Sequence, residues 1–98
     1  MIFRRRPFGD VIERQLGLVE SDDTDLVAAV EAARRAYREA DREDAEEAFG
    51  DYQLVLEALK DRLVEVRDAY AATLDHPEAY EAAFELAAVR RWPDLEAV

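Results

Sequence analysis

The chain contains no cysteine and no asparagine, and it has one histidine, one lysine and one serine among its 98 residues. The absence of cysteine excludes disulfides, thiolate catalysis and cysteine-based zinc sites. No apolar run approaches the roughly 18 residues that a membrane-spanning helix needs. The arginines at residues 4–6 precede Pro7, Phe8 and Gly9 instead of the apolar core of a signal peptide. We therefore expect a cytoplasmic protein without a membrane span.

Few side chains suited to catalysis remain, and none has the spacing of a known site. A di-iron carboxylate bundle needs a glutamate three residues before a histidine, but Thr73 stands three residues before His76. The acidic groups at 22–25 and 41–44 lack the spacing and glycine of an EF-hand loop. Ser21 is interpreted as a helix N-cap, and no glycine-rich phosphate loop is present. We expect no catalytic residue, no cofactor and no metal ligand, and predict that the chain is not an enzyme.

The charge is distributed unevenly along the chain. Residues 10–98 hold all 24 acids and ten basic residues, whereas residues 1–9 hold three arginines and no acid. An acidic body repels nucleic-acid phosphates and anionic lipid headgroups. Neither is therefore an expected partner.

Helix-forming residues dominate, and three glycines and three prolines act as breaks. The pattern predicts one all-α domain over residues 1–98. It begins with a basic and apolar arm at 1–9 and ends in a frayed tail at 94–98. Asp75 and Glu78 imitate a capping box around Pro77. The helices are expected over about residues 10–20, 22–42, 44–74 and 77–91.

The third segment carries the clearest periodic signal. Its apolar residues repeat with alternating steps of three and four, which places them on one face of a single long helix. This apolar stripe consists of Phe49, Tyr52, Leu56, Leu59, Leu63, Val66 and Tyr70. We expect an antiparallel helical hairpin built on this long central helix, with a short N-terminal helix and a C-terminal helix packed back.

A faint internal repeat links the middle and the end of the chain. Ala36-Tyr37, Ala45 and Ala48-Phe49 recur as Ala69-Tyr70, Ala79 and Ala83-Phe84, at offsets of 33, 34 and 35. Over residues 33–93 this resembles a tetratricopeptide helix pair, which implies a scaffold that binds peptides or proteins. The family's tryptophan, Leu-Gly pair and first-repeat proline are missing, and no turn separates Glu57 from Leu63. We interpret the repeat as two alanine-rich amphipathic hairpins.

Helix lengths predict a homodimer. The segments at 22–42 and 77–91 both fold back on the long helix and compete for its stripe near residues 59–66. The apolar residues of 77–91 also cover more than half of that helix's circumference, whereas one neighbouring helix covers about a third. A second copy that aligns two long helices relieves this competition.

The sequence also offers a candidate interaction surface. Its apolar and basic arm either closes the core of its own domain or reaches another chain; a third interpretation, contact with an anionic membrane, is opposed by the acidic body. Leu54 and Val64 lie off the main stripe. The candidate surface consists of Phe3, Arg4, Arg5, Arg6, Phe8, Leu54, Val64, Leu86 and Trp92.

These patterns favour a non-catalytic protein that mediates protein–protein interaction or assembly, through self-association. One alternative is a carboxylate-based metal-binding or ferroxidase-like helical protein. A further alternative is a ligand-binding helical sensor domain, which requires a pocket lined by Tyr37, Tyr52, Tyr70 and Phe84.

Overall fold

The computed structural model describes residues 8–98, and every regular element in this part of the chain is helical. The α-helices are α1 (Gly9–Asp22), α2 (Thr24–Glu39), α3 (Ala45–Ala71) and α4 (Glu78–Arg91), and a 3-10 helix, η1 (Pro93–Ala97), follows. The all-helical prediction is therefore confirmed for residues 8–98. No helix of this part combines the length and apolar character that crossing a membrane needs.

The longest helix, α3, runs without interruption through 27 residues. The central part of the apolar stripe, Tyr52, Leu56, Leu59 and Leu63, is buried. The helix ends at Ala71, earlier than the predicted 74, because the amides of Thr73 and Leu74 bond three residues back and tighten the last turn. Residues 57–63 lie inside α3, so the turn of a tetratricopeptide pair does not form there.

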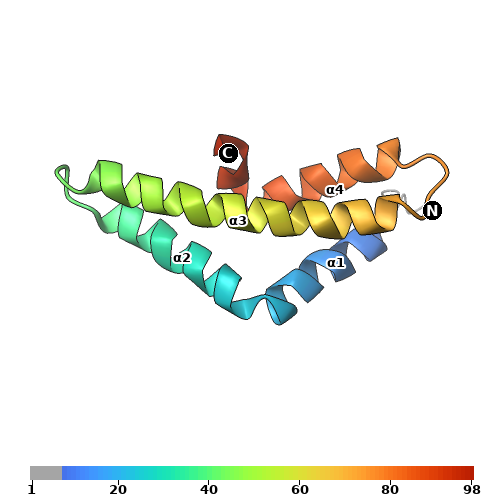
Figure 1. Cartoon of the computed structure of the whole chain (residues 1–98), viewed down its shortest axis with the longest axis horizontal. Helices are drawn as coiled ribbons and strands as arrows, with labels where there is room; N and C mark the ends of the chain where they lie inside the picture. The colour runs from blue at the N-terminus through green and yellow to red at the C-terminus, as the bar shows by residue number, and fades with distance from the viewer. Residues whose placement is uncertain (1–7) are drawn as a thin grey trace, which may run out of the picture.

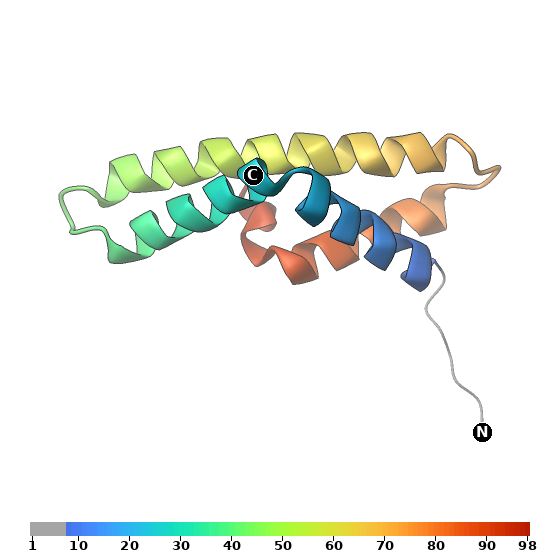
Figure 2. The same ribbon diagram turned by 90° about the horizontal axis from the view of Figure 1, so that it is seen from below.

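The other helices cover different lengths of α3. Figure 1 and Figure 2 show α2 beside the first part of α3, and α1 and α4 beside its second part. Helix α1 packs against α2, α3 and α4, and α4 packs against α3, α1 and η1. Within residues 8–98, the end of the molecule that carries the α2–α3 loop therefore consists of α2 and α3 alone. The molecule is elongated, with extents of 52 × 32 × 22 Å.

The core lies where the four α-helices meet. Leu16 of α1, Leu59 of α3 and Tyr80 of α4 are fully buried. The Tyr80 hydroxyl donates a 2.8 Å hydrogen bond to Gln15 Oε1, so its one polar atom is satisfied inside this core. Because α1 supplies Ile12, Leu16 and Val19 on one face, it closes the space between α3 and α4.

The end of the chain differs from the frayed tail predicted for residues 94–98. Pro93 starts a new turn after α4, because its missing amide is tolerated at a helix start. Trp92 and Leu95 are three residues apart, and in a 3-10 helix this spacing places them on one side. Both side chains are buried, so the tail closes part of the core.

The helix caps predicted at Ser21 and at Asp75–Glu78 also differ from the structure. The Ser21 hydroxyl donates to the Leu18 carbonyl oxygen at 3.3 Å, within the last turn of α1. Asp23 precedes α2, but its carboxylate makes no cap bond and accepts a 2.9 Å hydrogen bond from Arg62. Helix α4 likewise begins after Pro77 without a side-chain cap. At Asp23, a tertiary ion pair replaces the local cap.

Candidate interaction surface

Two exposed aromatic rings touch at the α2–α3 end of the molecule. Tyr37 of α2 is 39% exposed and Phe49 of α3 is 36% exposed. Their ring centroids lie 5.2 Å apart, and Tyr52 lies 6.2 Å from Tyr37 on the buried side of the pair. We call Tyr37, Phe49 and Tyr52 the α2–α3 aromatic cluster. It offers a continuous apolar surface in which the outer two rings reach solvent.

The exposure of Phe49 differs from its predicted burial on the apolar stripe. Tyr52 is buried, and its hydroxyl donates a hydrogen bond to Asp94 of η1. Phe49 lies about one helical turn closer to the α2–α3 loop, where α2 is the helix that packs on α3 (Figure 1). A helix that has one neighbour leaves the edge of its apolar stripe in water.

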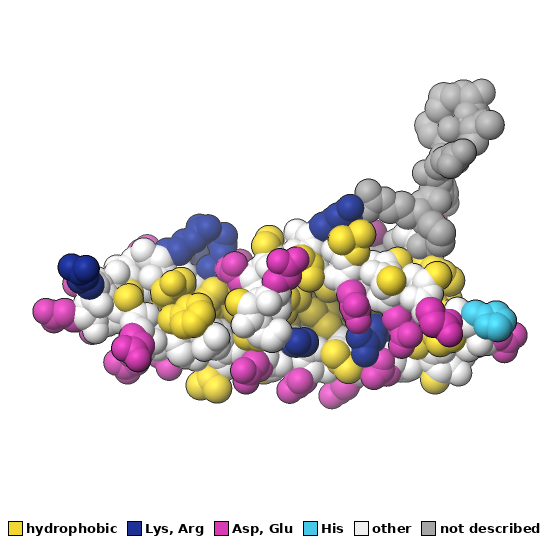
Figure 3. Space-filling view, turned by 90° about the horizontal axis from the view of Figure 1, so that it is seen from above, with side chains coloured by type: hydrophobic (Ala, Val, Ile, Leu, Met, Phe, Trp, Pro, Cys, Tyr) yellow, Lys and Arg dark blue, Asp and Glu magenta, His cyan; other side chains and the backbone are white. Residues whose placement is uncertain are grey.

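Helix α2 is balanced in charge, unlike the rest of the described chain. Residues 24–42 hold four of the ten basic residues of 10–98, but only four of its 24 acids. Figure 3 shows an exposed hydrophobic ring in the left-hand part of the molecule, with Lys and Arg side chains on one side of it and Asp and Glu on the other. The facing start of α3 is acidic, since residues 43–51 hold five acids and no basic residue, so α2 and the start of α3 differ in charge.

A small polar cavity lies where η1 meets α2 and α3. Its volume is about 140 Å³, and Arg34, Tyr52, Arg91 and Asp94 contribute to its lining. Tyr52 donates a 2.7 Å hydrogen bond to Asp94. Burial, and then this bond to a carboxylate, raise the pKa of Tyr52 to about 12.

Both arginines of the polar cavity bind carboxylates. Arg91 donates to Glu20 at 2.6 Å and to Glu13 at 2.8 Å, which ties α4 to α1. Arg34 lies 3.6 Å from Glu31 within α2. Because each cation already has an anionic partner, the cavity lacks the surplus positive charge that an anionic ligand needs. These groups hold helices together.

Two open grooves flank α4. One, of about 330 Å³, lies between α3, α4 and η1, with Leu63, Val64 and Phe84 among its lining residues. An ion pair between Arg67 and Glu85, 2.7 Å long, joins α3 to α4 beside this groove. The second groove, of about 360 Å³, lies between α1 and α4. We call it the α1–α4 groove.

The structure places the predicted surface residues in different environments. Leu54 is 66% exposed and Leu86 is 52% exposed, on α3 and α4 respectively. Val64 is half-buried in the groove between α3 and α4. Trp92 is buried and does not offer the surface expected of it. Val64 lines the groove between α3 and α4, Leu86 lines the α1–α4 groove, and Leu54 belongs to neither lining.

The predicted arm lies mostly outside the described residues. Phe3, Arg4, Arg5 and Arg6 belong to the part that the structure does not describe. Phe8 is half-buried, and its ring meets the Tyr80 ring edge-on with centroids 5.5 Å apart. Phe8 therefore packs on its own domain.

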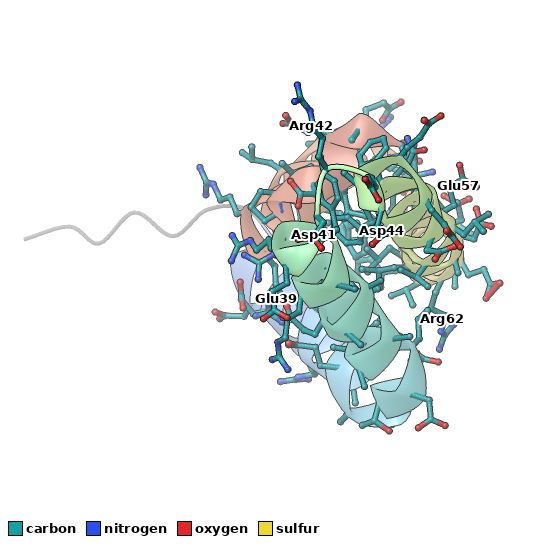
Figure 4. All side chains as sticks on the ribbon, turned by 90° about the vertical axis from the view of Figure 1, so that its left-hand side faces the viewer. Glu39, Asp41, Arg42, Asp44, Glu57 and Arg62 are labelled. Carbon is teal, nitrogen blue, oxygen red and sulfur yellow. The ribbon has the colours of Figure 1, made fainter. Side chains whose placement is uncertain are left out.

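The acidic groups do not assemble a metal site in residues 8–98, where no three His, Asp or Glu side chains are placed to hold an ion together. Asp23 binds Arg62 instead. Figure 4 looks onto the α2–α3 loop, where Arg42 extends outward from the loop. The amide of Asp44 donates to the Asp41 carbonyl oxygen at 2.9 Å, so this acidic segment forms a turn.

The aromatic residues proposed for a sensor pocket fall into two separate groups. Tyr37 and Tyr52 belong to the α2–α3 aromatic cluster. Tyr70 and Phe84 contact Tyr80, with centroid distances of 4.8 and 6.0 Å. The four residues therefore do not line one pocket.

Sequence reasoning missed Tyr37 and Phe49 as a surface, because Phe49 lies on the apolar stripe, which predicts burial, and Tyr37 was considered as a lining residue of a ligand pocket. One signal was present in the sequence: the balanced charge of residues 24–42 within an otherwise acidic chain. Comparison with protein-family models, with curated proteins and with solved structures finds no significant match to this chain.

Proposed function

We propose that this chain is a non-catalytic assembly module that binds a second copy of itself through the α2–α3 aromatic cluster. One observation carries the proposal: the α2–α3 end has two helices, and the touching rings of Tyr37 and Phe49 remain exposed there. Aromatic side chains bury a large area when they are covered, and they are enriched at the centres of protein interfaces.

A second copy supplies what this end lacks. Helix α4 and η1 cover one side of α3 over its second part, and nothing in residues 8–98 occupies the corresponding side over its first part. Another α2–α3 pair, laid against the first with the two α4 helices pointing apart, fits this space without meeting α4. Each copy then covers the rings of the other, and the four helices form a bundle with twofold symmetry.

The charge distribution supports a copy as the partner. Two molecules with a formal net charge of −11 repel each other over most of their surfaces. Helix α2 carries Arg34, Arg35 and Arg38, whereas residues 43–51 hold five acids and no base, so a contact that sets α2 of one copy against the start of α3 of the other pairs opposite charges. An apolar centre with a rim of both charges is typical of protein interfaces.

Little in the described residues supports catalysis as the competing function. The hydroxyl of Ser21 is bonded to a backbone carbonyl, and His76 lies in the α3–α4 loop, far along the chain from it. Metal analysis of natively purified protein tests the ferroxidase-like alternative. Stoichiometric iron or manganese would contradict a purely structural role.

Molar mass in solution tests the assembly proposal. One copy has a mass of 11.2 kDa, and sedimentation equilibrium of the full chain is expected to give twice this value. Phe49→Glu and Tyr37→Glu are each expected to shift the equilibrium to the monomer, because a carboxylate would be buried against the partner's rings. Leu54→Glu is the matched control, since Leu54 lies on α3 at an exposed site outside the cluster.

Circular dichroism must show that each variant remains helical. A monomer at all concentrations for the unmodified chain contradicts the proposal. A dimer that Phe49→Glu and Leu54→Glu weaken equally would place the interface elsewhere.

A further inference from the structure

Helix η1 lies on α3 with hollow space on both of its sides. Its first residues, Pro93 and Asp94, line the polar cavity of about 140 Å³. Its later residues, Leu95 and Glu96, line the groove of about 330 Å³ between α3, α4 and η1. In Figure 1, η1 stands as a short red element beside the middle of α3. The support of η1 on α3 and α4 is therefore narrow.

Two hydrogen bonds from α3 hold η1 in place. The Tyr52 hydroxyl donates to Asp94 Oδ2 at 2.7 Å, and Lys60 Nζ donates to the Val98 carbonyl oxygen at 2.8 Å. Between these two contacts, the buried side chain of Leu95 is the apolar anchor. The attachment of η1 thus consists of one apolar side chain and two polar contacts, one towards each end.

Pro93 is the point at which η1 separates most readily from α4. The Trp92 amide donates to the Ala88 carbonyl oxygen at 2.8 Å, so Trp92 stays with α4. Proline has no amide hydrogen, so a swing at this residue breaks no backbone hydrogen bond of its own. A 3-10 helix of five residues also has poorer hydrogen-bond geometry than an α-helix. A segment with few buried apolar contacts opens at a lower free energy than the whole domain.

Opening of η1 changes the surface next to the α2–α3 aromatic cluster. Tyr52 belongs to this cluster and is buried, and Asp94 is its hydrogen-bond partner in η1. Leu63 lies on the same apolar stripe and lines the groove together with Leu95. Removing η1 joins the polar cavity to this groove. We propose that η1 is a strap that swings open at Pro93 and thereby extends the self-association surface from Tyr52 towards Leu63.

This strap rests on the proposed dimer and regulates it. With η1 closed, a second copy meets η1 at the edge of the aromatic cluster; with η1 open, it covers a longer part of α3. Opening also withdraws two carboxylates, those of Asp94 and Glu96, from the edge that approaches an acidic second copy. The open form therefore binds the second copy more tightly, and by linkage the second copy favours the open form.

Native-state hydrogen exchange at low protein concentration tests the opening. The amides of Leu95 and Val98, which donate to carbonyl oxygens three residues back, are expected to exchange faster than those around Leu59 in α3. Their rates are also expected to stay constant in low urea, because a small opening exposes little surface. If these amides match the α3 amides in rate and in urea dependence, η1 opens only with the whole domain and the proposal is overturned.

A matched pair of variants tests whether η1 opens as a unit. Asp94→Ala removes the contact with Tyr52 and is expected to speed exchange about tenfold at both Leu95 and Val98, because a hydrogen bond to a charged group is lost. Glu96→Ala removes a carboxylate from the same helix at an exposed site and leaves both polar contacts in place, so it is expected to change neither rate. An effect of Asp94→Ala on Leu95 alone contradicts opening as a unit.

Sedimentation equilibrium of the same variants tests the regulation. Asp94→Ala is expected to tighten the dimer several-fold, and Glu96→Ala, which removes the same charge, is expected to tighten it less. If both variants tighten the dimer equally, charge alone acts, and the strap is overturned while the proposed dimer stands. A full chain that is monomeric at all concentrations overturns both. Circular dichroism checks that each variant remains helical.

Discussion

The Tyr52 hydroxyl donates a 2.7 Å hydrogen bond to the Asp94 carboxylate and so joins the first part of α3 to η1, 42 residues later in the chain. The bond stands at the boundary between two environments. On one side of it, η1 and Trp92 complete the core; on the other, Tyr37 and Phe49 are exposed. The boundary defines where the proposed second copy begins to cover α3.

Alkaline pH is expected to destabilise the protein through Tyr52. Burial and the bond to Asp94 raise the pKa of Tyr52 from 10.0 to about 12. Because the folded-state pKa is the higher one, this contribution to stability is complete below pH 10 and is lost as the pH rises towards 12. A shift of this size corresponds to about 3 kcal/mol at most.

Urea unfolding between pH 9 and pH 12 measures this effect. Tyr52→Phe is expected to make the loss of stability with rising pH less steep. Part of the loss remains, because burial also raises the pKa of Tyr80. Leu54→Ala, at an exposed site that carries no titratable group, is the control that keeps the original profile. If Tyr52→Phe loses stability with rising pH as steeply as the unmodified chain, the Tyr52 hydroxyl does not govern stability in this pH range.

Leu95→Ala is expected to lower the free energy of unfolding by about 2–5 kcal/mol, because removing this buried side chain leaves a cavity where η1 meets α3 and α4. Glu96→Ala, on the neighbouring exposed residue, is expected to change stability by less than about 0.5 kcal/mol. Thermal or urea unfolding compares the two. If both variants match the unmodified chain, the last residues fray as the sequence pattern alone predicted.

Replacing Gly50 with alanine is expected to stabilise the protein by about 0.5–1 kcal/mol. The residue lies inside α3, its φ is not positive, and a Cβ built there meets no atom within 4 Å. Gly17 in α1 meets the same conditions, so Gly17→Ala is expected to add a similar gain. Unfolding curves of the single and double variants test whether the two gains in stability are additive. A loss of stability in Gly50→Ala would indicate that a second copy packs against this position.

Local sequence patterns predicted the helices well where one periodic signal was long. The stripe around Leu59 fixed both the existence and the buried face of α3, because the helical period acts on neighbouring residues. Predictions at helix ends were weaker. Ser21 was expected to cap a helix, but α1 continues past it to Asp22, and Asp23 at the start of α2 is bound by Arg62, which is distant in sequence.

The sequence by itself determined that the chain is helical, that α3 is long, and which of its faces is apolar, since all three follow from propensity and spacing. Tertiary structure decided how much of that face is covered. Leu63 and Phe49, which are 14 residues apart, occupy equivalent places in the seven-residue repeat, yet Leu63 is 3% exposed and Phe49 is 36% exposed. The difference arises because α1, α4 and η1 gather around the second part of α3, and the period of a helix carries no information about where its neighbours end.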